Sequence, residues 1–353
     1  MQKNFINNNF DFLRLVAAYL VLFSHQFALT GRLEPNIGVQ SLGGLGVLIF
    51  FSISGYLVAQ SWERDPSAWR FLAKRVLRIW PGLIVVTVVT ALLLGPSVST
   101  LSFRGYFLSS AMWDFFSNLK LTVRFELPGV FTDNPYPRAV NGSLWTLPIE
   151  FRWYLILLVL GMVGLLRHQS LLLIGAVALA VFIFVIHDVQ HNPQRKPSLE
   201  LGAFFCYGVC LHYFRDFWSM WPKLVLAIFG LVGAIFVAIG YEYAALFLVL
   251  PMLVIFFGSA STPFIRRAGR FGDISYGLYI YAFPVQQTVI MLTGNLLSIW
   301  VTLVISTIVT VGLAFLSWHL AERPALLLKR KLGKEWPPFI LKRKISQPDV
   351  DSF

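Results

Sequence analysis

Charged residues are scarce in this chain. Asp, Glu, Lys and Arg make up 13% of its 353 residues, while hydrophobic residues make up 57%. Soluble globular domains carry about 25% charged residues, so a soluble domain of this length is excluded. The composition instead predicts a polytopic membrane protein, whose apolar side chains face lipid as well as a core.

Cysteines and acidic residues are also few. The two cysteines, Cys206 and Cys210, are spaced beyond disulfide reach on a regular helix and have no ligand-type neighbour, so we expect packing residues. The six histidines lack metal-ligand spacing, and no metal site is predicted.

The 17 acidic against 29 basic residues give a net charge of +12. The sequence contains no basic stripe interleaved with aromatic residues, the pattern that would indicate nucleic-acid binding. The basic residues are instead predicted to face the cytoplasm and the membrane lipid headgroups.

Long apolar runs, by contrast, are abundant. A membrane-spanning helix needs roughly 17–25 mostly apolar residues. Ten candidates satisfy this: 11–29, 42–61, 77–95, 144–166, 170–187, 199–214, 222–240, 243–260, 274–293 and 297–319. Residues 101–127 are aromatic and mixed in polarity, which predicts an interfacial helix and loop within a long connection over 96–143. That connection is long enough to be a lid or an acceptor-binding surface. The predicted fold class is an all-α polytopic membrane protein with about ten transmembrane helices.

The placement of Lys and Arg predicts the orientation. If both termini are cytoplasmic, 20 of the 29 basic residues lie on the cytoplasmic side and seven on the outer side, as the positive-inside rule requires. We therefore expect cytoplasmic termini and an even number of spans. Residues 1–330 are predicted to form one integral membrane domain, and the polar residues 331–353 a flexible cytoplasmic tail.

Two arginines lie one helical turn apart in the segment RVLRIWP, residues 75–81, directly before an apolar run. Arg75 and Arg78 share a helix face because residues i and i+3 are neighbours. Arginine binds phosphate in a forked geometry, so the pair predicts a phosphorylated ligand arriving from the cytoplasm. Ordinary positive-inside anchoring is the alternative.

Ionisable groups inside spans are costly and therefore functional candidates. Arg14 and His25 share a face of the first span, about 16 Å apart along its axis. Glu150 lies about six residues from the outer end of the fourth span, so we expect it at the depth of His25. Histidine suits proton abstraction from a hydroxyl, and a carboxylate can orient it. A core histidine bonded to a carbonyl, and an ion pair of Glu150 with Arg14 or Arg152, are the structural alternatives.

Small residues recur in the second predicted span, at Gly43, Gly46, Ser52, Ser54 and Gly55. They allow helices to approach closely, or they leave room for a narrow ligand tunnel.

Six motifs occur in a fixed order: Asp11-x-x-Arg14 with His25, Phe50-Phe51-x-x-Ser54-Gly55-Tyr56, Arg75-x-x-Arg78-Ile79-Trp80-Pro81, Asn141-Gly142-Ser143-Leu144-Trp145 through Glu150, Ser275-Tyr276-Gly277-Leu278-Tyr279, and Glu322-Arg323-Pro324. Over residues 5–328 this set resembles the acyltransferase 3 family of integral membrane acyltransferases. The resemblance implies transfer of an acyl group, usually acetyl from cytoplasmic acetyl-CoA, to a hydroxyl of an extracytoplasmic glycan or lipid-linked sugar.

The resemblance also implies roles for single residues. His25 becomes the catalytic base, and Arg14 and Glu150 become essential site residues. Arg75 and Arg78 become contacts for the acyl donor, to which we add two motif residues, Ser54 and Tyr56. His25 either deprotonates the sugar hydroxyl as it attacks the thioester or carries the acyl group transiently. No histidine follows the 275–279 motif and no soluble domain follows the last span, so the membrane domain is expected to complete the transfer alone.

We therefore predict a membrane O-acyltransferase of the bacterial inner membrane that decorates a cell-envelope polysaccharide. Its predicted partners are acyl-CoA, a carbohydrate or glycolipid acceptor, and membrane lipid. Acyl-CoA is a substrate here rather than a bound cofactor. The alternative is a proton-coupled transporter of a sugar or organic anion, with Arg14, His25 and Glu150 as a proton relay. Against it, no inverted repeat is visible, and a permeant substrate does not explain the arginine pair at 75 and 78. A different acyl group, such as succinyl, would change only the pocket.

Overall fold

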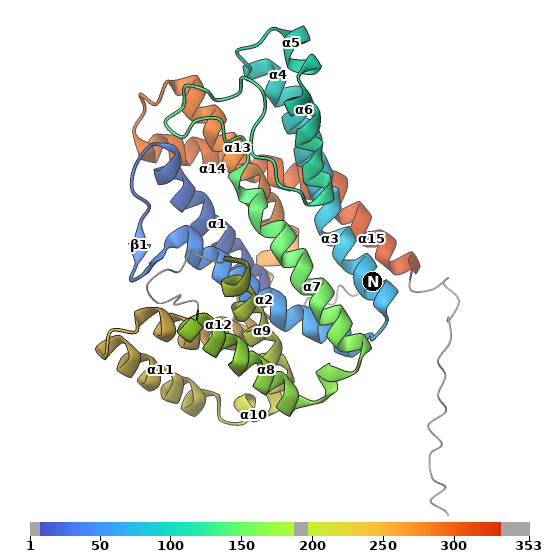
Figure 1. Cartoon of the computed structure of the whole chain (residues 1–353), viewed down its shortest axis with the longest axis vertical. Coiled ribbons are helices and arrows are strands. Elements are labelled where there is room, and N and C mark those ends of the chain that lie inside the picture. The colour runs from blue at the N-terminus through green and yellow to red at the C-terminus, as the bar shows by residue number, and fades with distance from the viewer. Residues whose placement is uncertain (1–7, 187–196, 333–353) are drawn as a thin grey trace, which may run out of the picture.

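A computed structural model describes residues 8–186 and 197–332, and it is a bundle of helices (Figure 1). In chain order the helices are α1 (Phe10–Leu29), α2 (Leu42–Arg64), α3 (Ala68–Val89), η1 (Thr90–Leu94), α4 (Gly95–Val98), α5 (Phe103–Leu108), α6 (Ser110–Asp114), η2 (Phe115–Lys120), η3 (Gly142–Trp145), α7 (Thr146–Met162), η4 (Leu165–Arg167), α8 (Gln169–Val181), η5 (Phe182–Ile186), α9 (Pro197–Tyr213), α10 (Arg215–Met220), α11 (Pro222–Ala238), α12 (Glu242–Ser259), η6 (Ile265–Phe271), α13 (Ser275–Thr293), α14 (Ile299–Ser317), η7 (Trp318–Glu322) and α15 (Arg323–Leu332). Two short antiparallel strands, β1 (Asn36–Ile37) and β2 (Gln40–Ser41), join α1 to α2.

Among the described residues, six helices are long and apolar enough to cross a membrane: Phe10–Leu29, Leu42–Arg64, Ala68–Val98, Gly142–Met162, Glu242–Ser259 and Ile299–Leu328. Two shorter apolar helices cover Gln169–Val185 and Pro222–Ala238. The predicted fold class, an all-α multi-pass membrane protein, is thus confirmed. A count of ten crossings and the cytoplasmic termini stay predictions, and the predicted tail from residue 333 onward lies outside the described part of the chain.

The third helix begins at Ala68, nine residues before the predicted span. Its first two turns carry two basic residues, Arg70 and Lys74, which pair with the Asp65 carboxylate at 2.5 Å and 2.7 Å. The extension places Arg75 and Arg78 inside a continuous helix rather than at its start. The predicted interfacial helix over 101–127 is instead three short helices, α5, α6 and η2. The first two lie at the end of the bundle beyond α3 (Figure 1), and η2 returns alongside α3, where Trp80 Nε1 donates to the carbonyl oxygen of Leu119 at 3.0 Å.

The small residues of α2 allow close helix packing. A Cβ atom at Gly46 would lie 2.5 Å from the carbonyl oxygen of Ala17 on α1, and one at Gly55 would lie 2.0 Å from that of Phe205 on α9. Backbone atoms cannot move aside, so only glycine fits at these two positions. For Gly46 and Gly55, close packing is therefore the interpretation that the structure supports, and it brings α1, α2 and α9 together at one side of the site.

Helix α13 lies in the core of the bundle, and every residue from Ser275 to Gln287 is buried. Its polar side chains find partners on other segments. The amide nitrogen of Gln286 donates to the carbonyl oxygen of Leu22 at 2.8 Å, and that of Gln287 donates to the carbonyl oxygen of Tyr136 at 2.7 Å. These bonds fix the long 96–143 connection and the second half of α1 against α13.

Candidate active site

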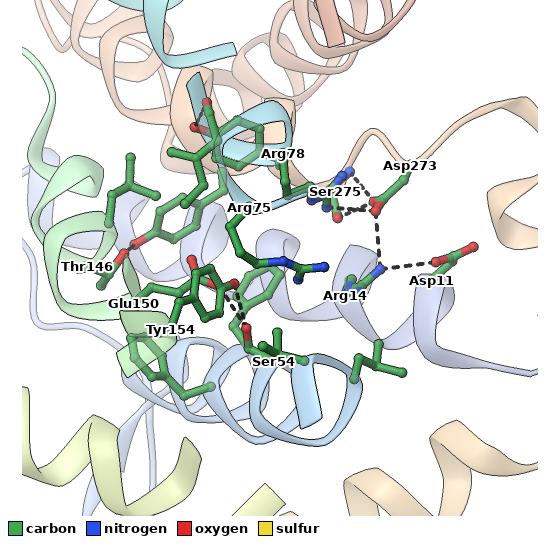
Figure 2. A pocket seen from close by; sticks show the side chains of 18 of the residues that line it. Asp11, Arg14, Ser54, Arg75, Arg78, Thr146, Glu150, Tyr154, Asp273 and Ser275 are labelled. Atoms are coloured by element: carbon green, nitrogen blue, oxygen red, sulfur yellow. Dashed lines mark hydrogen bonds and ion pairs between the residues drawn. The ribbon is translucent and has the colours of Figure 1, made fainter. Parts of the chain in front are cut away.

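A cavity of about 460 Å³ lies between α1, α2, α3, α7 and α13. Five of the seven predicted site residues line it, and they come from four different helices: Arg14, Ser54, Arg75, Arg78 and Glu150. Figure 2 shows their side chains around a common space. The volume is within the range of small-molecule sites, about 300–1,000 Å³.

One edge of the cavity is an ion-pair network that centres on Asp273, in the turn before α13. The Asp273 carboxylate lies 2.7 Å from Arg78 and 3.3 Å from Arg14, which also pairs with Asp11 at 3.3 Å (Figure 2). Burial would raise the pKa of Asp273, but the charges of Arg78 and Arg14 hold it below its ordinary value. Two of the three cavity arginines are thus already neutralised by protein carboxylates.

Arg75 differs from the other two cavity arginines. Its guanidinium lies 5.6 Å from the ring centre of Tyr154 and 5.8 Å from that of Phe71. Its Nε is buried, and within the described segments no hydrogen bond or ion pair joins the side chain to another residue. Figure 2 shows it pointing into the open space. The cavity therefore contains a guanidinium group that has aromatic faces beside it and, within the described segments, no carboxylate in hydrogen-bond or ion-pair contact.

Glu150 lies on the opposite side of the cavity in a small hydrogen-bond cluster. Ser54 Oγ donates to Glu150 Oε1 at 2.8 Å, and the Tyr154 hydroxyl donates to the same oxygen. The two hydroxyl groups are themselves 2.8 Å apart. Glu150 and Tyr154 share a face of α7 because they are four residues apart. Sequence reasoning did not include Tyr154 or Asp273, although the i, i+4 spacing to Glu150 was a usable signal for Tyr154.

His25 lies outside the cavity, near the C-terminal end of α1. Its ring packs edge-on against Phe283 of α13 at 5.3 Å, and Phe283 packs in turn against Tyr136 at 6.2 Å. Phe283 is one turn, about 6 Å, beyond Tyr279, which lines the cavity. His25 is thus close to the cavity's end but beyond it.

Two contacts lie at that end of the cavity. Phe50 packs edge-on against Tyr279 at 5.8 Å, and the Tyr279 hydroxyl lies 2.8 Å from Thr146 Oγ1. All three residues line the cavity. A ligand that extends from Arg75 to His25 has to pass them.

The expectation that Glu150 lies at the depth of His25 is wrong. A Cβ atom at Gly142 would lie 2.5 Å from the ring of Phe283, which itself packs against His25. Gly142, at the start of this helical segment, is therefore at the depth of His25. Glu150 follows eight residues later, about 12 Å further along the helix. The helical segment begins at Gly142, earlier than predicted, which moves Glu150 inward to Ser54.

Tyr56 also lies outside the cavity. Its ring packs against Phe10 at 5.6 Å and against His212 at 5.3 Å, on the side of α2 that faces away from Ser54. The structure therefore does not bring Tyr56 together with the other predicted donor contacts.

Comparisons with known proteins agree on one family. The acyltransferase 3 family model, described as an acyltransferase domain, matches residues 7–319. An O-acetyl transferase of Shigella phage Sf6 is 34% identical over 331 residues, covering 90% of this chain and 95% of that protein. Nodulation protein 10 of Rhizobium leguminosarum bv. viciae is 31% identical over 364 residues, covering 92% of this chain and 95% of that protein.

A third relative is longer than this chain. Peptidoglycan O-acetyltransferase OatA of Listeria monocytogenes is 27% identical over 329 residues, which cover 80% of this chain and 51% of that protein. No solved structure is significantly similar to the chain.

Proposed function

The chain belongs to the acyltransferase 3 family, and from this premise we propose that it transfers an acetyl group from cytoplasmic acetyl-CoA to a hydroxyl of an extracytoplasmic or lipid-linked carbohydrate. Membership of this family identifies the chain as an enzyme, an acyltransferase, and argues against the transporter alternative. Acetyl as the group is supported by the names of two relatives, and a glycan as acceptor by the name of one. A bacterial inner membrane as the location and the cell envelope as the source of the acceptor belong to the same proposal.

Arg75 is the observation that carries the donor assignment. A guanidinium in an apolar bundle without a directly paired carboxylate is costly, and an incoming anion in contact with it would relieve that cost. Coenzyme A carries phosphate groups, which match the forked donors of a guanidinium. The aromatic faces of Tyr154 and Phe71 hold Arg75 in place without neutralising its charge. Arg14 and Arg78 form the second part of this binding site, at the Asp273 network.

His25 is the proposed catalytic base. It takes the proton of the acceptor hydroxyl while the oxygen attacks the thioester carbonyl carbon. The carbon–sulfur bond breaks, and the coenzyme A sulfur leaves with the proton that His25 returns. In the alternative two-step route, His25 Nε2 or Nδ1 first accepts the acyl group and then passes it to the hydroxyl. In both routes the thioester has to pass Phe50 and Tyr279, while the acceptor approaches from the side of exposed Tyr136.

Coenzyme A binding to the purified protein tests the donor site. Arg75→Ala is expected to weaken binding at least about ten-fold, because a charge-assisted contact contributes on the order of 1.5–3 kcal/mol. Arg152→Ala is the matched control, since Arg152 is an exposed arginine on α7 outside the cavity. Calorimetry with coenzyme A measures both. Equal affinity of Arg75→Ala and wild type would contradict the assignment.

A further inference from the structure

A carboxylate that the sequence motifs do not contain reaches the end of α1 that carries His25. Glu34 lies in the connection between α1 and β1, and its side chain turns inward to the end of α1. There it accepts a hydrogen bond from the hydroxyl of Ser24, the residue that precedes His25. Ser24 is fully buried, so the contact joins a loop carboxylate to the interior of the bundle.

The contact depends on a glycine in the neighbouring helix. A Cβ atom at Gly43 of α2 would lie 3.0 Å from Ser24 Cβ and 3.6 Å from Glu34 Oε2. Gly43 therefore leaves space for the Ser24 side chain and the carboxylate that it holds. The site is thus built by three segments, the end of α1, the following loop and the start of α2.

Ser24 and His25 are consecutive residues of α1, so this hydrogen bond brings the Glu34 carboxylate to the turn of the helix that carries His25. Glu150, the carboxylate expected at the depth of His25, is occupied in the cavity by Ser54 and Tyr154. His25 Nδ1 is buried and has no hydrogen-bond partner among the residues that the structure describes. An imidazole in this environment gains a positive charge only at a large cost unless an anion is near.

We propose that Glu34 is the positioning residue of His25, held by Ser24 so that its negative charge stabilises the imidazolium formed when His25 takes the acceptor's proton. The proposal rests on the proposed function, because it assigns a role within the acyl transfer. The proton moves from the hydroxyl to His25 and then to the leaving sulfur, so no further reactant is needed.

Two substitutions separate the charge of Glu34 from its anchoring role. Glu34→Gln retains an oxygen that can accept from Ser24 but removes the charge. Ser24→Ala retains the charge but removes the hydrogen bond. A residue that only fastens the loop would tolerate the first change and suffer from the second, whereas a charge that serves His25 gives the opposite order.

The test uses membranes of an expressing bacterium, with radiolabelled acetyl-CoA as donor and the cell's own glycans as acceptor. Glu34→Gln is expected to lower the maximal rate per enzyme about 10- to 100-fold, with the KM for acetyl-CoA within about two-fold of wild type. Glu34→Asp is expected to restore most of the rate, and Ser24→Ala to lose less than Glu34→Gln. Glu242→Gln is the matched control, because exposed Glu242 lies near Gly38 of the same loop but away from His25.

A Glu34→Gln rate within about five-fold of wild type would overturn the inference, as would a Ser24→Ala loss equal to the Glu34→Gln loss. If His25→Ala abolishes transfer while Glu34→Gln does not, the proposed function stands and only the role of Glu34 fails. If wild-type membranes transfer no acetate at all, the proposed function fails, and the role of Glu34 fails with it.

Discussion

The three arginines that line the cavity differ in their partners, because two of them are paired with carboxylates and one is not. Arg14 and Arg78 share Asp273, whereas Arg75 faces only aromatic rings and the Glu150 side of the cavity. The proposed donor, coenzyme A, carries more than one phosphate group. It would contact Arg75 directly, and at Arg14 and Arg78 a phosphate oxygen would replace a carboxylate oxygen.

Removal of the Asp273 charge is expected to destabilise the protein in a pH-dependent way. The pKa of Asp273 is lowered in the folded protein by Arg78 and Arg14, despite burial, so the ionised carboxylate stabilises the folded state. This contribution is complete above the ordinary aspartate pKa of about 3.9 and is lost as the pH falls through the lower folded-state pKa. Asp273→Asn should therefore cost about 2–3 kcal/mol at pH 7, because it removes the stabilisation that the lowered pKa represents.

Thermal unfolding in detergent measures this difference. The melting temperature of Asp273→Asn should lie several degrees below that of wild type at pH 7, and the gap should narrow below about pH 4. Asp216→Asn is the control, since Asp216 is almost fully exposed, at 94%. A gap that is unchanged at low pH would show that the carboxylate charge is not what stabilises the network.

Sequence reasoning predicts contacts within one helix better than contacts between segments that are far apart in the chain. Arg75 and Arg78 form a recognisable pair because their i, i+3 spacing is a local property of one helix. Asp273 sits in an irregular turn 195 residues after Arg78, and nothing in its neighbourhood along the chain indicates that contact. Glu150 was placed too far outward because the relative depth of two helices depends on tertiary packing, here of Gly142 against Phe283.

At the scale of elements, the site depends on how closely α2 packs against its neighbours. Helix α2 contributes Ser54 to the cavity on one face and Gly55 to the α9 contact on another. The same short motif thus contains a cavity residue and a packing residue. Its third member, Tyr56, packs on His212 and shows that a residue in a functional motif need not face the ligand.

Gly55→Ala is expected to disrupt the α2–α9 pair. The new Cβ would lie 2.0 Å from the carbonyl oxygen of Phe205, so the two backbones have to separate, at a cost of about 3 kcal/mol or more. The yield of monodisperse protein on size exclusion in detergent measures the loss. Gly312→Ala on α14 is the matched control, because nothing lies within 4 Å of its Cβ position. Equal yields from the two variants would argue against this packing.

At the scale of the whole molecule, the cavity and His25 lie at different depths of one bundle. Arg14 and His25 are at opposite ends of α1, and the Phe50–Tyr279 contact lies between their levels. The proposed function uses this separation, with the donor bound at one end and the acceptor at the other. The all-α class follows from composition, whereas the number of crossings stays a prediction, because helices such as α9 and α13 are buried by neighbours and carry polar side chains.

The predicted orientation can be tested with single introduced cysteines. Leu33, 95% exposed after the end of α1, is expected on the outer side, and Asp216 on α10 in the cytoplasm. A membrane-impermeant maleimide added to intact cells should label Leu33→Cys and spare Asp216→Cys until the membrane is permeabilised. The unsubstituted chain, whose Cys206 and Cys210 are largely enclosed in the bundle, gives the background. The reverse labelling pattern would refute the orientation.

The central claim, transfer of acetyl from coenzyme A to a carbohydrate, is tested most directly by the label itself. Membranes that contain wild-type protein, His25→Ala or no protein are given acetyl-CoA labelled in the acetyl group, and alkali-labile label on the glycan fraction is measured. The account predicts labelled glycan with wild type alone, with His25→Ala inserted in equal amount and at least about 100-fold less active. Label that is absent with wild type, or that persists with His25→Ala, would contradict it.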